Sequence, residues 1–536
     1  MQHFGQERRE VIWDGVEGRQ WDVVVVGGGI VGAGIAKEAS RAGLSVVLLE
    51  AKDFAWGTSG RSSKMIHGGL RYLKERRIRV TREAVHERER LLETGRGLVD
   101  PLPFLYLTCQ GDPSPSWLVG LGLAAYDLLN GHASGSESLA VHDLPLFAPN
   151  LNLKSVRGAY RYLDGVTDDA RLVFRVLREA TRMGAWALNY AAVEGLVKEG
   201  AGTVRGVVAK DAVGGGRAEI RAAVVVNATG AWARELTGPE GLPFVLRPLR
   251  GSHLVLPWEG LPVTHAVTFA HPRDGRPVFA YPWEEVTLVG TTDMDHNAPL
   301  NLEPAASEEE VGYLLEAVRA RFQDAPDYED LLGTFAGVRP VISGGEEQPS
   351  REPREHAVWE ERNLVTVTGG KLTTFYPMSR RVLRIVLKRT RRRKVGGGEG
   401  RGLEPVSARI TERAQEELRT LPHLLRRRIA GRLGPDLADF LDWVGKEDLE
   451  QIAGTPYTWA ELGWAAKREA VVHLDDLLLR RARIGHLLPD GASALEEEME
   501  RRIRPLLGWT EERWRTEWTR YRRLWATHHG PRPLVR

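Results

Sequence analysis

The sequence predicts an α/β protein with a Rossmann-like dinucleotide-binding domain built from discontinuous segments, an inserted, mainly antiparallel β domain, and a C-terminal all-helical domain. Three observations lead to this prediction. A β-branched run near the N-terminus breaks into glycines over residues 22–34. Two later apolar runs also end in glycine turns, near residues 230 and 370. Beyond residue 404 the apolar positions recur at helical spacing, and no glycine motif follows.

Residues 22–50 have the order of elements that a dinucleotide-binding βαβ unit requires. The run Val23–Val26 predicts a buried parallel strand. Gly27, Gly29 and Gly32 then allow a sharp turn and a close approach of a pyrophosphate to a helix N-terminus. A second buried strand ends at Glu50, which is placed to accept hydrogen bonds from a ribose. The order of these elements disfavours the alternative, a glycine-rich turn in an ordinary α/β core, but it does not distinguish FAD from NAD.

The remaining elements follow from hydrophobic periodicity. Helices are expected through residues 83–92, 172–184 and 372–387, and strands near 187–190, 193–198, 224–230 and 363–370. Short apolar runs separated by Pro, Gly and Asp predict a mainly antiparallel sheet over 251–290. Three glycine-tipped strand ends that converge on one ligand suit a long, extended FAD better than NAD.

A basic, glycine-rich run gives the clearest domain boundary. It is expected to be a linker rather than a nucleic-acid patch, because no aromatic residues interleave it. The expected divisions are 15–105, 155–250 and 335–388 for the dinucleotide-binding domain, 106–154 and 251–334 for the substrate domain, 389–403 for the linker, and 404–536 for the helical domain.

Composition narrows the class of protein further. The net charge of +2 gives no bulk argument for nucleic acid or a membrane. The single cysteine, Cys109, excludes an intrachain disulfide framework, and no motif predicts a metal. The polar N-terminus lacks the apolar core of a signal peptide, so a cytoplasmic location is expected. The longest apolar stretch, 117–129, is too short to span a bilayer and is expected to form a mainly buried helix, with a membrane-facing or quinone-facing surface as the alternative.

The glycine-rich loop 57–73 carries a resemblance to a known family. With its sequence Thr-Ser-Gly-Arg-Ser-Ser-Lys-Met-Ile-His-Gly-Gly-Leu-Arg-Tyr-Leu from Thr58, the chain resembles the FAD-dependent (aerobic-type) glycerol-3-phosphate dehydrogenases of the glycine-oxidase and D-amino-acid-oxidase flavoprotein superfamily. Met65 stands where the family has Leu. Further matching motifs follow in the family's order, at 162–172, 227–232, 251–253, 290–293, 336–340 and 369–374, and a fainter one at 469–481.

The resemblance implies FAD as the cofactor and a set of residues that bind it. His67 is expected in the flavin cradle, and Lys371, at a helix start, near the flavin pyrimidine ring. The implied FAD-binding residues are Gly27, Gly29, Gly32, Glu50, Thr58, Ser59, Ser62, Ser63, Lys64, His67, Gly69, Leu70, Val193, Ala228, Thr229, Gly230, Trp232, Gly370, Lys371, Leu372 and Thr373.

The substrate side of the site is expected around four residues. Arg71 is the predicted phosphate ligand, because a guanidinium binds phosphate oxygens in a planar, two-pronged way, and Tyr72 is its neighbour. The alternative for Arg71 is a side chain that extends from the start of a helix to solvent. Arg339 is expected to polarise the substrate oxygen and His253 to accept the hydroxyl proton, with the alternatives of a surface ion pair and a structural histidine. Lys371 completes the predicted catalytic set.

The resemblance implies oxidation of sn-glycerol 3-phosphate to dihydroxyacetone phosphate, with electrons passed from FAD to a quinone. It also implies peripheral attachment to the inner face of the cytoplasmic membrane, and a homodimer is one arrangement that it leaves open. The alternatives are an oxidase that releases peroxide, a non-catalytic FAD-binding partner in assembly or RNA modification, and, more weakly, an NAD-dependent enzyme. Two pairs are expected to be non-catalytic: Asp168 and Asp169 in an ion pair with Arg171, and His528 and His529 in solvent.

Overall fold

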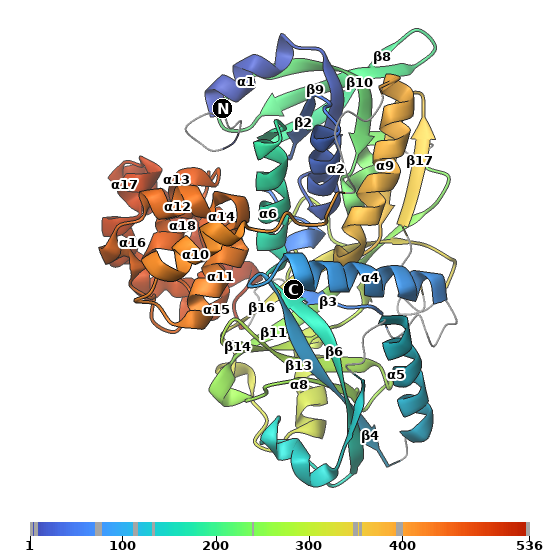
Figure 1. The fold of residues 1–536 in the computed structure, drawn as a ribbon, viewed down its shortest axis with the longest axis vertical. Helices are drawn as coiled ribbons and strands as arrows, with labels where there is room; N and C mark the ends of the chain where they lie inside the picture. The colour runs from blue at the N-terminus through green and yellow to red at the C-terminus, as the bar shows by residue number, and fades with distance from the viewer. Residues whose placement is uncertain are drawn as a thin grey trace.

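The computed structural model describes residue 4 and residues 9–69, 78–110, 116–130, 135–237, 241–346, 352, 356–392 and 400–531. Figure 1 shows an eight-stranded sheet with its helices at the top, a ten-stranded sheet at the bottom, and a group of C-terminal helices at the left. The predicted α/β class with a C-terminal helical domain is confirmed.

The eight-stranded sheet contains the predicted βαβ unit. Its strands run in the order β17-β18-β10-β1-β2-β7, with β8 and β9 attached through β10. Their bounds are β1 (Trp21–Val26), β2 (Val46–Leu49), β7 (Trp186–Leu188), β8 (Ala191–Glu199), β9 (Thr203–Asp211), β10 (Arg217–Asn227), β17 (His356–Glu361) and β18 (Leu364–Gly369). The five strands from β18 to β7 are parallel to one another.

The parallel register brings the three glycine-tipped strand ends to one edge. Val26 on β1 pairs with Asn227 on β10, which pairs with Thr366 on β18. Each strand leads into its glycines just beyond this level, at Gly27, Gly230 and Gly369. The predicted convergence is therefore confirmed.

Helices cover both faces of this sheet, which is why β1 is a continuous apolar run. Val23 and Val25 contribute to a core with α2 (Ile30–Arg41), α6 (Asp169–Arg182) and α9 (Phe375–Thr390). Val24 and Val26 face the opposite side, where α1 (Arg9–Glu17) packs.

The ten-stranded sheet is mainly antiparallel, as predicted for residues 251–290, with one parallel pair between β4 and β12. Its strands are β3 (Met65–Ile66), β4 (Val99–Cys109), β5 (Glu137–Leu139), β6 (Val156–Thr167), β11 (Leu246–Pro257), β12 (Ala266–Ala270), β13 (Pro277–Trp283), β14 (Val286–Gly290), β15 (Met294–Asp295) and β16 (Gly333–Ile342). The associated helices are α4 (Ile78–Thr94), α5 (Ser116–Asn130) and α8 (Glu308–Arg321).

Strand pairing divides the chain differently from the expected domain bounds. β3, β6 and β16 fall in segments expected in the dinucleotide-binding domain, yet they belong to the ten-stranded sheet. The reason is that β6 pairs along its length with β4, and β16 pairs with β11 over ten residues. Such long-range partners leave no local signal in the sequence.

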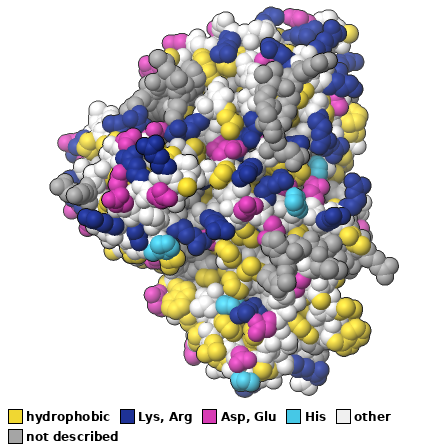
Figure 2. Space-filling model, in the orientation of Figure 1, with side chains coloured by type: hydrophobic (Ala, Val, Ile, Leu, Met, Phe, Trp, Pro, Cys, Tyr) yellow, Lys and Arg dark blue, Asp and Glu magenta, His cyan; other side chains and the backbone are white. Residues whose placement is uncertain are grey.

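The C-terminal part is a group of helices around a tryptophan-rich core. Trp514 and Trp518 are buried in it, and Phe335 of β16 belongs to the same cluster. The longer helices are α10 (Ala408–Glu417), α11 (His423–Leu433), α12 (Leu437–Trp443), α13 (Trp459–Arg468), α16 (Glu496–Arg502) and α18 (Glu511–His528). The shorter ones are α14 (Leu474–Asp476), α15 (Ile484–Leu487) and α17 (Arg504–Leu507), with a π-helical turn at Leu477–Arg481. On the face seen in Figure 2, basic and acidic side chains are interspersed over this part.

The apolar helix α5 is less buried than expected. Leu123 and Tyr126 are buried, but Trp117, Leu118 and Leu121 are exposed, Trp117 to 67%. The expectation of a mainly buried helix is therefore wrong for one of its faces. Among the described residues, none of the helices combines the length and the apolar character that crossing a membrane requires.

Candidate functional site

The glycine fingerprint forms a turn in which backbone packs on backbone. Gly27 has φ +110°, and a Cβ there would lie 2.6 Å from the carbonyl oxygen of Ala228. A Cβ on Gly32 would lie 1.9 Å from the carbonyl oxygen of Gly27. Gly29 precedes α2, and a Cβ there would lie 3.0 Å from Ser59 Oγ. Glycine is therefore needed for this close approach of β1, β10 and the start of α2.

Glu50 lies directly beside this turn. Its Oε2 accepts a hydrogen bond from the Gly28 backbone N–H at 2.6 Å, and its Oε1 accepts one from the Lys52 N–H at 2.9 Å. Burial raises the pKa of Glu50, and the two backbone donors oppose that shift. The structure thus places the predicted ribose acceptor against the fingerprint.

The loop that begins at Thr58 contacts the helices α2 and α6 and the ten-stranded sheet. Ser59 Oγ accepts a hydrogen bond from the N–H of Ile30 at the start of α2, and Thr58 Oγ1 donates to the carbonyl oxygen of Val338 on β16. Ser62 donates to Asp169 through both its N–H and its Oγ, each at 2.8 Å. The loop therefore lies between the glycine edge and the ten-stranded sheet.

Lys64 points away from this loop into a buried cluster. Its Nζ lies 3.2 Å from Asp169 Oδ1 and 4.4 Å from the ring centroid of Phe335. Burial lowers the pKa of Lys64 to about 8, although Asp169 opposes the shift. The Lys64 ammonium group is thus engaged inside the protein, whereas its backbone belongs to the loop.

His253 is a buried, neutral imidazole on β11. Its Nε2 lies 2.8 Å from Ser63 Oγ, and its ring stacks on Phe335 with centroids 4.6 Å apart. Burial, with smaller contributions from Arg339 and Lys64, holds the pKa of His253 well below its usual value. The ring is therefore unprotonated at neutral pH and offers an acceptor nitrogen.

Arg339 lies near His253 on the adjacent strand, β16. Its Nη1 donates to Asp293 Oδ1 at 3.0 Å, and its Nη2 donates to Thr291 Oγ1 at 2.9 Å. A Cβ on Gly251 would lie 2.3 Å from the guanidinium, so a glycine at that position leaves room for it. The side chain is 24% exposed, which leaves part of the charge available to a ligand.

The third strand end brings Lys371 close to His67. Lys371 precedes the short helix Leu372–Thr374, and the Thr373 hydroxyl donates to the carbonyl oxygen of His67 at 3.5 Å. Burial, Lys371 and Arg88 lower the pKa of His67 to about 3. Gly370 has φ +80°, and a Cβ there would lie 2.5 Å from the sulfur of Met378.

The other predicted cofactor residues lie at or near the same edge. Ala228 donates its N–H to the Val26 carbonyl oxygen, Thr229 Oγ1 donates to Asn227, and the Gly230 carbonyl oxygen accepts from Thr368. Trp232 is partly exposed and lies against Trp56, whereas Val193 is on β8 and Gly69, with φ +79°, follows His67. Three predicted residues, Leu70, Arg71 and Tyr72, lie outside the described residues.

Two expectations about charged residues need correction. Asp168 and Asp169 are ion-paired as expected, but the arginine that pairs with both is Arg483 of the C-terminal part, and Arg171 instead pairs with Glu469. The Asp168 carboxylate also caps α6.

The expectation that His528 and His529 lie in solvent is wrong for His529, whereas His528 is partly exposed. His529 is 2% exposed, and its Nε2 lies 3.1 Å from Glu303. Glu303 also accepts hydrogen bonds from Arg61 of the glycine-rich loop and from Trp56, just before that loop. This buried group was missed because Glu303 is more than 200 residues from each of its partners and forms no motif with them.

Glycine-tipped backbone from β1, β10 and β18 gathers at one edge of the sheet, beside the loop that begins at Thr58. This is the edge at which α/β folds bind a dinucleotide. These features define a dinucleotide-dependent oxidoreductase of the α/β class. The chain belongs to the family of FAD-dependent oxidoreductases, whose model matches residues 22–382, and residues 388–514 match the C-terminal domain of alpha-glycerophosphate oxidase. Its cofactor is FAD.

Known proteins resemble nearly the whole chain. It is 34% identical over 528 residues to glycerol-3-phosphate dehydrogenase 2 of Mycobacterium tuberculosis, covering 95% of this chain and 88% of the relative. It is 32% identical to the aerobic glycerol-3-phosphate dehydrogenase of Staphylococcus haemolyticus, with 88% of each chain covered. The crystal structure of glycerol-3-phosphate dehydrogenase from Bacillus halodurans complexed with FAD superimposes with a TM-score of 0.79 at 26% identity, covering 99% of both chains.

Proposed function

We propose that this protein oxidises sn-glycerol 3-phosphate to dihydroxyacetone phosphate and passes the electrons through FAD to a quinone. The observation that carries the proposal is a neutral, buried His253 beside the cationic Arg339, where the ten-stranded sheet meets the cofactor loop. The names of the relatives support the choice of substrate.

His253 is proposed as the group that takes the hydroxyl proton. Bound FAD supplies the hydride acceptor for the carbon that carries this hydroxyl. With its proton on Nδ1, the imidazole offers Nε2 as an acceptor, which Ser63 now occupies at 2.8 Å. A substrate hydroxyl that reaches Nε2 can transfer its proton there, and burial of the ring keeps bulk water from competing.

Arg339 is proposed to stabilise the substrate oxygen. Its contacts with Asp293 and Thr291 fix the guanidinium plane while part of the side chain stays exposed. A cation held there favours negative charge on the oxygen as its proton leaves. Arg71 and Tyr72 are proposed to bind the phosphate group, on the sequence pattern that they share with the family.

The FAD contacts predicted from the sequence are proposed as follows. The fingerprint turn holds the pyrophosphate, and Glu50 accepts from the adenosine ribose. Lys371 places its charge near the flavin pyrimidine ring, where it would favour reduced, anionic flavin.

An anaerobic flavin spectrum tests the reaction. Mixing the purified holoenzyme with glycerol 3-phosphate should bleach the oxidised flavin band, and glycerol without phosphate should not. An intact flavin band after addition of glycerol 3-phosphate would overturn the proposal and favour a non-catalytic flavoprotein.

The electron acceptor has a second candidate. Because residues 388–514 match a domain described from an oxidase, molecular oxygen is the alternative to a quinone. Turnover with glycerol 3-phosphate should reduce a soluble quinone analogue and release little peroxide. Stoichiometric peroxide at a comparable rate would assign the oxidase activity instead. Peripheral membrane attachment is proposed with the quinone acceptor, and it is tested by sedimentation with lipid vesicles.

A further inference from the structure

The loop over residues 50–57 encloses Gly28, the second residue of the glycine turn. The Gly28 N–H donates to Glu50 Oε2 at 2.6 Å, and the Gly28 carbonyl oxygen accepts from the N–H of Ala55 at 3.1 Å. A Cβ on Gly28 would lie 2.7 Å from the ring of Phe54. The loop thus holds Gly28 from both sides, and its position fixes the position of the phosphate-binding turn.

Asp53 lies in this loop and is completely buried. Its Oδ2 accepts from Arg480 Nε at 2.6 Å and from Arg481 Nη1 at 2.5 Å. Its Oδ1 accepts from Arg481 Nη2 at 2.8 Å and from Asn189 Nδ2 at 2.9 Å. Burial opposes ionisation of Asp53, but Arg481 and Arg480 more than offset it and lower its pKa. A charged Asp53 is therefore held by two arginines more than 400 residues away in the chain.

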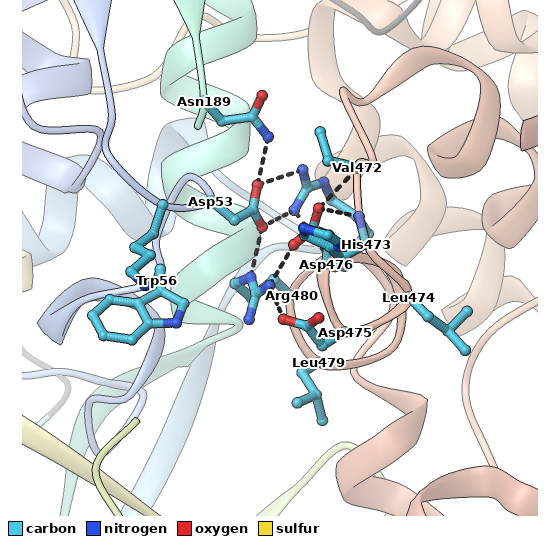
Figure 3. Close-up of polar contacts among 12 residues, drawn as sticks. Asp53, Trp56, Asn189, Val472, His473, Leu474, Asp475, Asp476, Leu479 and Arg480 are labelled. Atoms are coloured by element: carbon cyan, nitrogen blue, oxygen red, sulfur yellow. Dashed lines mark hydrogen bonds and ion pairs between the residues drawn. The ribbon is translucent and has the colours of Figure 1, made fainter. Parts of the chain in front are cut away.

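The two arginines also contact residues other than Asp53, in the C-terminal part and on α6. Arg480 Nη2 donates to Asp475 at 2.6 Å and to Asp476 at 2.5 Å, and Figure 3 shows it between these carboxylates and Asp53. Arg481 stacks on the ring of Phe174 at 4.0 Å, and its Nε donates to the carbonyl oxygen of Glu469. The two guanidinium groups are thus held by contacts additional to those with Asp53.

We propose that Arg480 and Arg481 are positioning residues for FAD: through Asp53, the C-terminal helical domain holds the loop that fixes the phosphate-binding turn. Phe54 and Ala55 anchor this loop in the apolar core. Asp53 and its partners are polar and need specific geometry, so their contacts restrict the position of the loop further. The C-terminal domain therefore contributes to cofactor binding indirectly, through the contacts of Arg480 and Arg481 with Asp53.

The test compares two buried aspartates at the interface with the C-terminal part. Asp53→Asn removes the charge that the two arginines hold. Asp436→Asn is the matched control, because Asp436 is also completely buried and pairs with two arginines, Arg178 and Arg182 of α6. Neither of those arginines lies in the 50–57 loop. The readout is the rate at which diluted holoenzyme releases FAD, followed by flavin fluorescence.

Asp53→Asn should release FAD about 10-fold faster than the unchanged protein, within the range of typical couplings between sites. Asp436→Asn should lower thermal stability but leave the release rate within about twofold. Equal release rates for the two variants would overturn the proposal. If Asp53→Asn does not fold, Arg481→Lys, which keeps the charge but not the two-pronged contact, should release FAD several-fold faster, and an unchanged rate would overturn the proposal.

Linkage supplies a second, independent measurement. If the helical domain holds the loop for FAD, then FAD binding must stabilise the docked domain by the same free energy. Removal of FAD should therefore lower the hydrogen-exchange protection of amides 474–483 in the full chain. Identical protection with and without FAD would contradict the proposed coupling.

Discussion

Substitution of Gly32 by alanine tests whether the fingerprint is specified by steric contact rather than by helix propensity. Gly32 lies within α2, where alanine would ordinarily favour the helix by about 1 kcal/mol. The added Cβ, however, would lie 1.9 Å from the Gly27 carbonyl oxygen, and real Cβ contacts are essentially never under 3.0 Å. The two must therefore separate by about 1.1 Å.

Neither side of this contact can retreat freely. The Gly27 N–H donates to the Leu49 carbonyl oxygen at 2.8 Å, and the side of Gly27 on which a Cβ would stand is occupied by the Ala228 carbonyl oxygen, 2.6 Å from that Cβ position. Overpacking of this kind costs about 1–3 kcal/mol, and a clash between backbone and Cβ falls at the upper end. After the gain in helix propensity, we expect a net loss of about 2 kcal/mol in the free energy of unfolding.

Gly122→Ala is the matched control, because Gly122 is also a helical glycine and a Cβ there meets nothing within 4 Å. It should stabilise the protein by up to about 1 kcal/mol. Urea unfolding gives the free energy of unfolding of both variants, and flavin fluorescence gives their rates of FAD release. The release rate should rise at least about 10-fold for Gly32→Ala alone, because about 1.4 kcal/mol corresponds to a tenfold change. Equal unfolding free energies and equal FAD release for the two variants would refute the steric argument.

Three further predictions follow from buried charges and the candidate base. His253→Asn should retain FAD but lower kcat by about 10²–10⁴-fold. The pKa of His253 is already well below its usual value, so the kcat/KM of the unchanged protein should show no loss from protonation of His253 between about pH 8 and 6.5. Burial lowers the pKa of Lys64 from 10.5 to about 8, so the unfolded chain binds the Lys64 proton more tightly than the folded protein does. The free energy of unfolding should therefore rise from pH 8 to 10 relative to that of Lys64→Met. The same pH dependence of unfolding in the variant would contradict this. Glu303→Gln leaves Arg61 buried without its carboxylate and should cost about 3–5 kcal/mol in urea unfolding, against less than about 1 kcal/mol for the exposed control Glu194→Gln; equal losses would exclude the buried pair as the cause.

The sequence was sufficient for the dinucleotide edge because its signals are local. An apolar run followed by glycines, such as Val23–Val26, predicts a buried strand and a turn from neighbouring residues alone. The parallel register then aligns the ends of β1, β10 and β18. The membership of β6 and β16 in the second sheet could not be predicted, because a strand's residues do not identify its partner. Pairing decides which sheet a segment joins.

The site shows the same division between local and long-range information. His253 and Arg339 could be proposed separately from their motifs, but only the pairing of β11 with β16 brings them together. The burial of Lys64 against Asp169 and of His529 against Glu303 carried no signal, since each depends on side chains from distant elements. Contacts of this kind can be identified only from the folded structure.

Three arginines of the C-terminal part explain how two neighbouring segments, residues 50–57 and 58–63, are held in position. Arg483 donates to the carbonyl oxygen of Gly60 at 3.0 Å and pairs with Asp169, which in turn accepts from Ser62. Ser63, the next residue, lies against His253. Buried ion pairs of this kind add little net stability compared with apolar contacts, but each has one satisfactory geometry. The helical domain therefore positions both loops: Arg480 and Arg481 hold the loop at the glycine turn, and Arg483 holds the neighbouring loop beside the candidate base, His253.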